Sequence, residues 1–410
     1  MREDVDYINA LFASDCPLLR CEYDELKGRM IRVTSDIPAG FLIYQGKALH
    51  AVCEDVNHWV FKKLKDLSIK KKLYYDPIWY WCALCSFTGL DELSENLLLP
   101  VISDSAQKQL LMLYRPDPSP SPSPGVLAIG AELSLRKCQV VKLEVLLQTW
   151  KYNCFEHSDK PLGFSVHFLP SFLAHSCHPN AIWDEDGTEI STSTDTPLFS
   201  MRSRRQVKSG DELTISYLPE EHLCRPVVER RKDLHATKGF FCECERCGPR
   251  GEESSFEDCS PNFSPASSAD DPYADKARNV LEDLSSRGVK IPCDKSAVVL
   301  IDCRRVLGDG HWISVWINSY LIDFYTSEKK NHSALQAARL RAIWLERLLP
   351  ESANAALAWA WEEHGDLEFS FGDIKEGLSL YARAESALGT LFGERSRWVS
   401  ELKRKISRPQ

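Results

Sequence analysis

The sequence predicts an α+β protein in which a strand-rich core with a helical insert is followed by a short cysteine segment and an all-helical C-terminal domain. Three observations support this fold class. Short apolar runs between turn residues recur over 20–52 and 126–219, as in a β-fold. The stretch GFFCECERCG, residues 239–248, concentrates three cysteines. Over 276–410, apolar residues recur at helical spacing.

The composition limits the compartment and the partners. With 410 residues, 43% of them hydrophobic, the chain is long enough for two or three domains with real cores. A net charge of −9 argues against general binding of nucleic acid or of an anionic membrane. The N-terminus MREDVDYINALF lacks the pattern of a secretory signal, and no apolar run is long enough to span a bilayer. Fifteen scattered cysteines then indicate reduced thiols in the cytoplasm or nucleus.

We expect six segments in chain order. They are the first part of the β-core at 1–52, a helical insert at 53–125, the main core at 126–223, the cysteine segment at 224–250, a linker at 251–275 and the helical domain at 276–410. The insert ends in RPDPSPSPSPG, whose composition favours an exposed loop with polyproline character. The linker is rich in Ser, Pro, Gly and acidic residues. The residues expected in the core of the insert are Trp59, Phe61, Leu64, Trp79, Trp81 and Leu84.

The helical domain carries signals for individual helices. Asp373 is a suitable N-cap, and Gly393 is a suitable C-terminal stop. Bulky and small residues recur at offsets typical of a tetratricopeptide unit, although a generic helical bundle is the alternative. The residues at these offsets are Trp361, Gly365, Gly377, Tyr381 and Ala384.

The helical domain is also rich in tryptophan. Not all of these side chains can fit inside thin two-helix layers, so some should lie at an interface with the core or with a second copy in a homodimer. In the first case the domain would wall one side of a peptide-binding cleft. The tryptophans concerned are Trp312, Trp316, Trp344, Trp359, Trp361 and Trp398.

The clustered cysteines predict a structural zinc site. Cys242, Cys244 and Cys247 have the spacing C-x-C-x-x-C, and a tetrahedral zinc ion needs a fourth ligand. The segment FLAHSCHPNA offers Cys177 for this position, although a lone buried cysteine is more often a small apolar core residue. The other candidates for the fourth ligand are Cys224, Cys259 and His235.

Several other conspicuous residues have simpler interpretations. Cys82 and Cys85 lie one helical turn apart in the apolar stretch WYWCALCSF and are expected in the core. His178 is expected on the surface of its turn. The basic run MRSRRQVK, residues 201–208, is more typical of a solvated strand edge than of a binding patch. Tyr217, taken alone, is more typical of a core tyrosine on a strand.

Three ordered motifs resemble a known family. AHSCHPNA, GDELTISYL and FFCECERC follow one another as in SET-domain protein lysine methyltransferases, and KGRMIRVTSDIPAGFLIY resembles the first motif of that family. The split of this first motif from the others and the helical tail are similar to the SMYD subfamily. The insert lacks the cysteines and histidines of a MYND finger. Apical complex lysine methyltransferases of apicomplexan parasites are a further resemblance, which would imply association with the cytoskeleton.

The resemblance implies a role for each matching residue. Tyr217 would be the catalytic tyrosine, and Phe155 would line the channel for the substrate lysine beside it. Cys177, Cys242, Cys244 and Cys247 would hold zinc and close the cofactor pocket. The residues implied to contact S-adenosylmethionine are Lys27, Gly28, Arg29, Asn153, Ser171, Ala174, His175, Tyr217 and Phe240.

Two positions depart from the family pattern. Ala174 stands where relatives usually have Asn, so one hydrogen bond to the cofactor should be missing. Met30 stands where the first motif has its second glycine. Both changes weaken the expectation of catalysis without removing it, because Tyr217, His175 and the cysteines are present.

Three hypotheses about function follow. The first is a protein-lysine N-methyltransferase, whose partner is a protein or peptide containing lysine and whose location is cytoplasmic or nuclear. The second is a non-catalytic scaffold that binds a protein through its helical tail, with a cofactor site that has decayed at Ala174 and Met30. The third is a repeat-type peptide binder that does not need residues 1–247.

Overall fold

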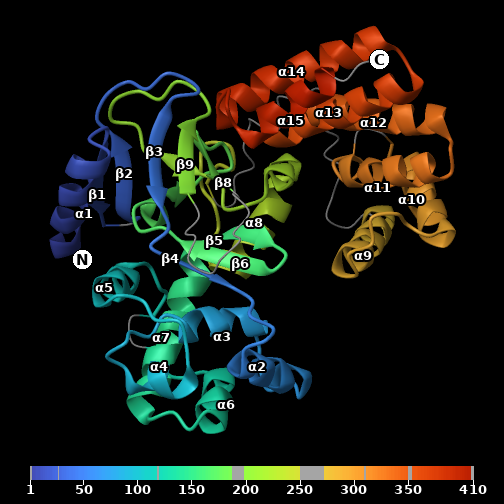
Figure 1. Ribbon diagram of the computed structural model, residues 1–410. Coiled ribbons are helices and arrows are strands. Elements are labelled where there is room, and N and C mark those ends of the chain that lie inside the picture. The colour runs from blue at the N-terminus through green and yellow to red at the C-terminus, as the bar shows by residue number, and fades with distance from the viewer. Residues whose placement is uncertain are drawn as a thin grey trace.

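The computed structural model describes residues 2–25, 27–117, 120–186, 198–249, 272–308, 311–349 and 353–407. The expected linker at 251–275 therefore lies mostly outside the described residues, and the alternative zinc ligand Cys259 lies outside them altogether. Figure 1 shows a β-core, a helical lobe below it and a long helical tail at its upper side.

The N-terminal segment forms strands, as predicted. A helix that the sequence did not indicate precedes them and packs against the first strand. Gly28 makes the turn between the first two strands with a φ of 81°, a left-handed value that glycine adopts without strain. The elements are α1 (Arg2–Asp15), β1 (Leu19–Asp24), β2 (Gly28–Val33), β3 (Leu42–Lys47) and β4 (His50–Cys53).

The helical insert is longer than predicted. It comprises α2 (Trp59–Ile69), α3 (Pro77–Leu84), α4 (Glu92–Leu97), α5 (Asp104–Met112), α6 (Pro124–Glu132) and α7 (Lys137–Asn153), and forms the lower lobe of Figure 1. The expectation of strands from residue 126 is thus wrong as far as residue 153. Val140, Leu143, Leu147 and Trp150 recur at helical spacing on α7 and are all buried, so the apolar run VVKLEVLLQTW belongs to a helix.

Most of the predicted core of the insert is confirmed. Phe61, Leu64, Trp81 and Leu84 are at most 1% exposed, and Trp79 is half-buried. The prediction that Trp59 lies in the core is wrong. Trp59 is the first residue of α2 and is 41% exposed, and its ring stacks on that of His58.

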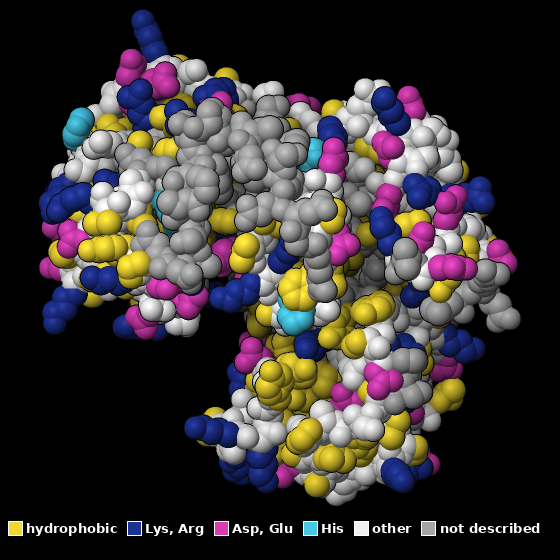
Figure 2. All heavy atoms as spheres, turned by 180° about the vertical axis from the view of Figure 1, so that it is seen from behind, with side chains coloured by type: hydrophobic (Ala, Val, Ile, Leu, Met, Phe, Trp, Pro, Cys, Tyr) yellow, Lys and Arg dark blue, Asp and Glu magenta, His cyan; other side chains and the backbone are white. Residues whose placement is uncertain are grey.

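The insert lobe carries hydrophobic side chains on its surface as well as in its core. Figure 2 shows that they gather on the lower part of the molecule. The most exposed of these side chains in the insert are Ile69, Tyr74, Leu90 and Leu98. Cys82 and Cys85, by contrast, are fully buried, as predicted.

The core strands on both sides of the insert belong to common sheets. The later strands are β5 (Cys154–Asp159), β6 (Leu162–Val166), β7 (Ala174–His175), β8 (Ala181–Asp186), β9 (Leu198–Ser203) and β10 (Thr214–Ile215). Strand β3 pairs with β9 in the order β3-β9-β8, and β4 pairs with β6 in the order β4-β6-β5. The insert is therefore an excursion from one β-core.

The basic run 201–208 is not the solvated strand edge that was expected. Arg204 is 3% exposed, and its guanidinium donates to the carboxylate of Glu220, with Nη1 3.1 Å from Oε1. Arg202 and Arg205 donate to main-chain carbonyls. These arginines lie inside the fold because neighbouring loops supply acceptors, which the sequence pattern does not reveal.

The C-terminal half is helical, as predicted. After η2 (Glu220–Cys224) it comprises α8 (Val227–Lys238), α9 (Pro272–Ser286), α10 (Asp294–Leu307), α11 (Ser314–Ser327), α12 (Asn331–Leu348), α13 (Ala355–Phe371), α14 (Ile374–Phe392) and α15 (Arg397–Ile406). Asp373 caps α14 by accepting from the backbone amide of Lys375, as expected. None of the helices within the described ranges combines the length and apolar character needed to cross a bilayer.

Helices α13 and α14 pack closely at two glycines. A Cβ atom on Gly365 would lie 2.7 Å from the ring of Tyr381, and one on Gly377 would lie 2.6 Å from the ring of Phe369. Only glycine allows this approach, so the two helices pack closely at these positions. Whether they form a tetratricopeptide-like unit stays a prediction. Gly393, with a φ of 94°, follows the last residue of α14.

Tail tryptophans contact the core, as one of the two alternatives predicted. The indole of Trp398 lies 3.3 Å from Asp184 on β8, and Trp316 packs against His222 and Arg225. The buried Arg246 also joins the two parts, because its guanidinium donates to carbonyls of the core and the tail. Self-association through the same aromatic residues stays a prediction.

Candidate active site

Four cysteines come together between the core and the tail. The Sγ atoms of Cys177, Cys242, Cys244 and Cys247 all lie within 4.8 Å of one another, and three of the four residues are buried. Cys177 follows β7, whereas the other three follow α8, so the fold joins segments far apart in the sequence. Cys224 and His235, which sequence reasoning also considered, are not members of this cluster. Four thiols at this separation suit a tetrahedral zinc ion.

The surroundings of the cluster suit an anionic metal centre. Arg230 is fully buried, and its Nη2 donates to Cys247 Sγ at 3.3 Å. The backbone amide of Cys177 donates to Cys244 Sγ at 3.4 Å. Hydrogen bonding to Cys177 lowers the pKa of Cys244, which favours its thiolate. Four thiolates around a divalent ion leave two negative charges, and these donors would stabilise them.

His175 links the cluster to Tyr217. Strands β7 and β10 pair in parallel, so residues 42 positions apart become neighbours. The backbone amide of Tyr217 donates to His175 Nδ1 at 2.9 Å, which places the imidazole proton on Nε2, 3.3 Å from Cys177 Sγ. Burial lowers the pKa of His175 to about 4, so the ring is neutral near pH 7. The ring of Phe240 completes this group, 6.0 Å from His175 and 6.3 Å from Tyr217.

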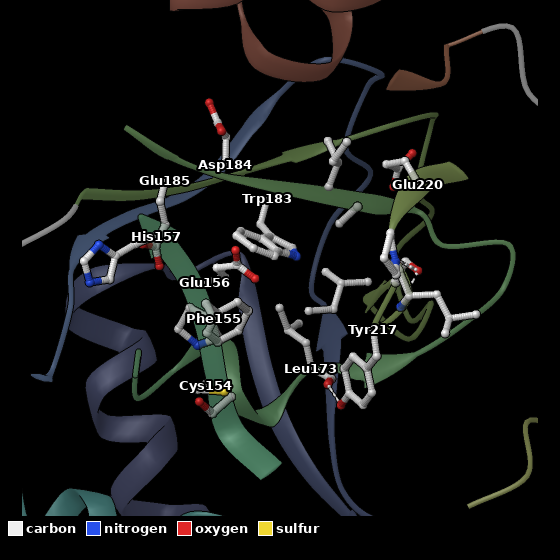
Figure 3. A pocket seen from close by; sticks show the side chains of 18 of the residues that line it. Cys154, Phe155, Glu156, His157, Leu173, Trp183, Asp184, Glu185, Tyr217 and Glu220 are labelled. Carbon is white, nitrogen blue, oxygen red and sulfur yellow. Dashed lines mark hydrogen bonds between the residues drawn. The ribbon is translucent and has the colours of Figure 1, made fainter. Parts of the chain in front are cut away.

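Tyr217 points its hydroxyl into a cavity of about 510 Å³. The hydroxyl donates to the carbonyl of Leu173 at 2.5 Å, as Figure 3 shows. Burial raises the pKa of Tyr217, so the hydroxyl stays protonated well above neutral pH. Tyr217 as a whole residue is 36% exposed. Its hydroxyl oxygen is nevertheless held in place by the hydrogen bond to the Leu173 carbonyl.

The cavity lies between the β-core and the tail. Phe155 and Trp183 form part of its wall with their rings at 82° and centroids 5.0 Å apart. Figure 3 shows both rings and the carboxylate of Glu156 between the cavity walls. The tail contributes Trp359, Phe392, Arg397 and Trp398 to the lining. Phe155 and Tyr217 therefore line one cavity, and its use as a lysine channel stays a prediction.

Asn153 and Ser171 also line this cavity, but other contacts occupy their polar atoms. Asn153 Nδ2 donates to the carbonyls of Tyr114 and Thr149, both at 2.7 Å. Ser171 Oγ donates to the carbonyl of His167 at 2.6 Å. Asn153 and Ser171 thus stabilise the local backbone with their donor groups. The acceptors that a ligand could use are Asn153 Oδ1 and the lone pairs of Ser171 Oγ.

The first-motif residues are not among those that line the cavity. Lys27 forms an ion pair with Glu212 at 2.8 Å. Arg29 donates to the carbonyl of Met112 at 2.9 Å and lies 4.6 Å from the ring centroid of Phe172, next to Ser171 in the chain. The structure thus brings Arg29 to Phe172, the residue after Ser171, whereas Lys27 contacts Glu212. Met30 is buried in the core.

Sequence reasoning missed several cavity residues. Lys238, at the end of α8, places its Nζ 5.6 Å from the centroid of the Tyr217 ring. Asp184, Glu185 and Glu220 also line the cavity. These residues belong to no motif, and their only sequence signal was the position of Lys238 two residues before Phe240.

The comparisons with known proteins identify the core. Residues 28–218 match the family model of the SET domain. This part of the chain is therefore similar to a SET domain. All strands from β2 to β10, and the whole insert, fall within these bounds.

Curated relatives match short stretches of this chain. A histone-lysine N-methyltransferase SET5 of Meyerozyma guilliermondii is 35% identical over 92 residues, which are 22% of this chain and 17% of that protein. A SET and MYND domain-containing protein of Dictyostelium discoideum is 30% identical over 107 residues, 26% of this chain and 24% of that protein. The matches thus span a quarter or less of these relatives.

A solved structure resembles the whole chain only distantly. The SET domain of LSMT bound to lysine and AdoHcy covers 100% of this chain and 97% of its own, with 12% sequence identity and a TM-score of 0.35. The assignment of the SET domain therefore depends on the family model and the curated relatives.

Proposed function

We propose that the protein is an S-adenosylmethionine-dependent protein-lysine N-methyltransferase. The observation that carries the proposal is the placement of Tyr217, whose hydroxyl is fixed on the Leu173 carbonyl inside a cavity of the SET domain. The similarity of one segment to histone-lysine N-methyltransferases supports the same activity. The substrate would be a lysine side chain of a protein or peptide, and the location cytoplasmic or nuclear.

Tyr217 would position the substrate amine rather than deprotonate it. Methyl transfer to nitrogen needs a free lone pair, and a lysine with an ordinary pKa of about 10.4 must first lose a proton, at a cost of roughly 4 kcal/mol near neutral pH. Because the Tyr217 hydroxyl donates to Leu173, its own lone pairs remain to accept an N–H of the amine. The amine would then be held with its lone pair on the line of attack.

Bound S-adenosylmethionine would supply the electrophilic methyl group. The residues that would hold it are those around His175: Phe240 against the adenine, Asn153 and Ser171 with their acceptor atoms, and Arg29 near the carboxylate end. The contact of His175, Tyr217 and Phe240 supports this arrangement. Lys27 would need to leave Glu212 to contribute.

We infer that the cysteine cluster holds one structural zinc ion. With four protein ligands, the ion would have no open position for chemistry. Its role would be to fold residues 240–248 so that Phe240 stays against His175. The buried Arg230 beside Cys247 supports a permanently anionic centre here.

The test of the proposed activity is direct. Full-length protein is incubated with labelled S-adenosylmethionine and a protein extract, and label transferred to lysine is measured. We expect transfer, and also thermal stabilisation by S-adenosylhomocysteine, because a ligand that binds only the folded state raises its stability. A non-catalytic scaffold would show neither effect, so the absence of both would favour that alternative.

Replacing Ala174 with Asn is expected to increase the affinity for S-adenosylmethionine up to tenfold. Ala174 lies on β7 beside His175 and is half-buried, so an amide there could supply the hydrogen bond that alanine lacks, about 0.5 to 1.5 kcal/mol net. Calorimetric titration of the cofactor measures the change. If the affinity does not rise, Ala174 does not face the cofactor, and its place in the binding site is refuted.

Replacing Trp398 with Ala is expected to raise KM for a protein substrate about tenfold with little change in kcat. Trp398 lines the cavity, bonds to Asp184 and packs on Trp359, so its loss would open the cleft on the tail side. Steady-state kinetics measure both constants. Phe371→Ala is the control, because this tail aromatic is 44% exposed and does not line the cavity. Equal KM values for the two variants would contradict a tail that walls the cleft.

The arrangement of insert and tail also supports a relation to the SMYD subfamily without a MYND finger. The insert that separates the first motif from the others contains helices and, apart from one isolated bridge between Thr88 and Ile102, no strand where the structure describes it. The tail packs beside the SET domain as helix pairs. Helices α13 and α14 have the close glycine contacts that a tetratricopeptide-like unit requires.

A further inference from the structure

Lys238 lies beside the candidate catalytic tyrosine, although the proposed reaction does not use it. It is the last residue of α8, where Gly239, with a φ of 77°, ends the helix. Its Nζ lies over the ring of Tyr217, 5.6 Å from the centroid, and the residue lines the same cavity as Phe155 and Tyr217. A lysine side chain is charged near neutral pH, so it brings a cation to the proposed amine site.

The carboxylates of the cavity are directed mainly at other groups. Glu185 lies 2.6 Å from His167, and Glu220 accepts from Arg204. Asp184 is contacted by Trp398 and, at 3.9 Å, by Arg397. Glu156 is exposed on β5. Glu185, Glu220 and Asp184 thus each have a basic partner other than Lys238.

Arg397 brings a second cation to the lining, on the tail side beside Asp184, whereas His157, His175 and Tyr217 are neutral near pH 7. Burial lowers the pKa of both His157 and His175 and raises that of Tyr217. Burial also raises the pKa of Cys154 to about 11, while the charge of Lys238 acts against this rise. The field of Lys238 therefore reaches from Tyr217 to β5, across the space that a substrate lysine would enter.

We propose that the charge of Lys238 favours the neutral amine of the substrate lysine over its ammonium, and so increases the reactive fraction. This inference rests on the proposed function. The physical reason is that a fixed cation repels a second cation but not a neutral amine. Two unit charges about 6 to 8 Å apart, at an effective dielectric constant of about 20, shift a pKa by roughly one to two units before solvent screening.

The balance of the reaction is unchanged by this effect. The substrate ammonium releases a proton to solvent, the nitrogen–methyl bond forms as the sulfur–methyl bond of the sulfonium breaks, and Lys238 takes no part in either bond. Lys238 acts through space on the substrate and is therefore a positioning residue. Its signature is a change in how the rate depends on pH.

The experiment compares single-turnover rates of the wild type, Lys238→Met and Lys238→Arg from about pH 6 to about pH 10. We expect Lys238→Met to move the rising limb of the profile about one unit to higher pH. Its rate would then be about tenfold lower at neutral pH and would approach the wild-type rate at the alkaline end. Lys238→Arg keeps the charge and should keep the limb near its wild-type position. Lys232→Gln, an exposed lysine of the same helix, should change nothing.

Two outcomes would overturn the inference while leaving the proposed function standing. One is a rising limb of Lys238→Met at the wild-type position, and the other is a loss of rate that is equal at every pH, which indicates a packing role only. Melting temperatures of the variants show whether the fold is retained, and Lys238→Gln, which also removes the charge, takes the place of Lys238→Met if that variant does not fold. A wild-type protein that transfers no methyl group at any pH would instead overturn the proposed function itself, and this inference with it.

Discussion

Methyl transfer by Tyr217→Phe is expected to be about a hundredfold slower or worse than by the wild type, while the fold and the metal content stay unchanged. The substitution removes only the hydroxyl that bonds to Leu173. The ring still packs against His175 at 5.4 Å and against Phe240 at 6.3 Å, so the local structure should survive. Without the hydroxyl, the amine loses the acceptor that would hold it on the line of attack.

The measurement is a single-turnover assay with labelled S-adenosylmethionine. Because burial raises the pKa of Tyr217, its hydroxyl stays protonated over the assay range, and the ratio of the two rates should be nearly constant between about pH 7 and about pH 9. Tyr44→Phe is the control, since Tyr44 lies on β3 and does not line the cavity. A Tyr217→Phe rate within threefold of the control would remove Tyr217 from the catalytic role.

Cys177→Ser is expected to lose the zinc ion and, with it, the order of residues 240–248. Apparent binding energies of structural zinc in small peptides are about 10 to 16 kcal/mol, so a site that loses one of four ligands loses much of its folding energy. Phe240 would then leave His175, and cofactor binding should fall together with metal content. Elemental analysis measures zinc per chain, and hydrogen exchange measures the protection of residues 240–248.

Cys224→Ser provides the matched control. Cys224 is as buried as Cys177 and was an alternative fourth ligand, but its Sγ lies 2.9 Å from the carbonyl of Glu221 and outside the cluster. We expect one zinc ion per chain in this variant and almost none in Cys177→Ser. Full zinc content in Cys177→Ser, or loss of zinc in Cys224→Ser, would refute the assignment of the fourth ligand.

The spacing of residues within short segments was sufficient to predict several parts of the structure. The C-x-C-x-x-C motif fixes three sulfur atoms within one turn of chain, so the cluster could be predicted without knowing the fold. The N-cap Asp373 and the stop at Gly393 act within a few residues, and α14 lies between them. Cys177 could be named only as one of several candidates for the fourth ligand, because the pairing of distant strands is what brings it to the other three.

The predictions of secondary structure and burial that were wrong concern sequence patterns that are compatible with two different structures. An apolar run such as VVKLEVLLQTW can be a buried strand or a buried helix, and the choice depends on what packs around it. Here α7 packs against α3, so the insert extends to Asn153. Trp59 was assigned to the core by its size, but its side chain faces outward from the start of α2.

The sequence by itself determined the individual SET-like motifs, the C-x-C-x-x-C segment and the helical tail, because each depends on residues close together in the chain. Only the tertiary structure decided that Lys238 lies over Tyr217, that Arg230 lies beside Cys247 and that Trp398 closes the cavity. The reason is that residues from many segments contribute to the electrostatic field and to the walls of a cavity. The spacing of residues within one segment does not show which other segments lie beside it, so these features depend on the fold.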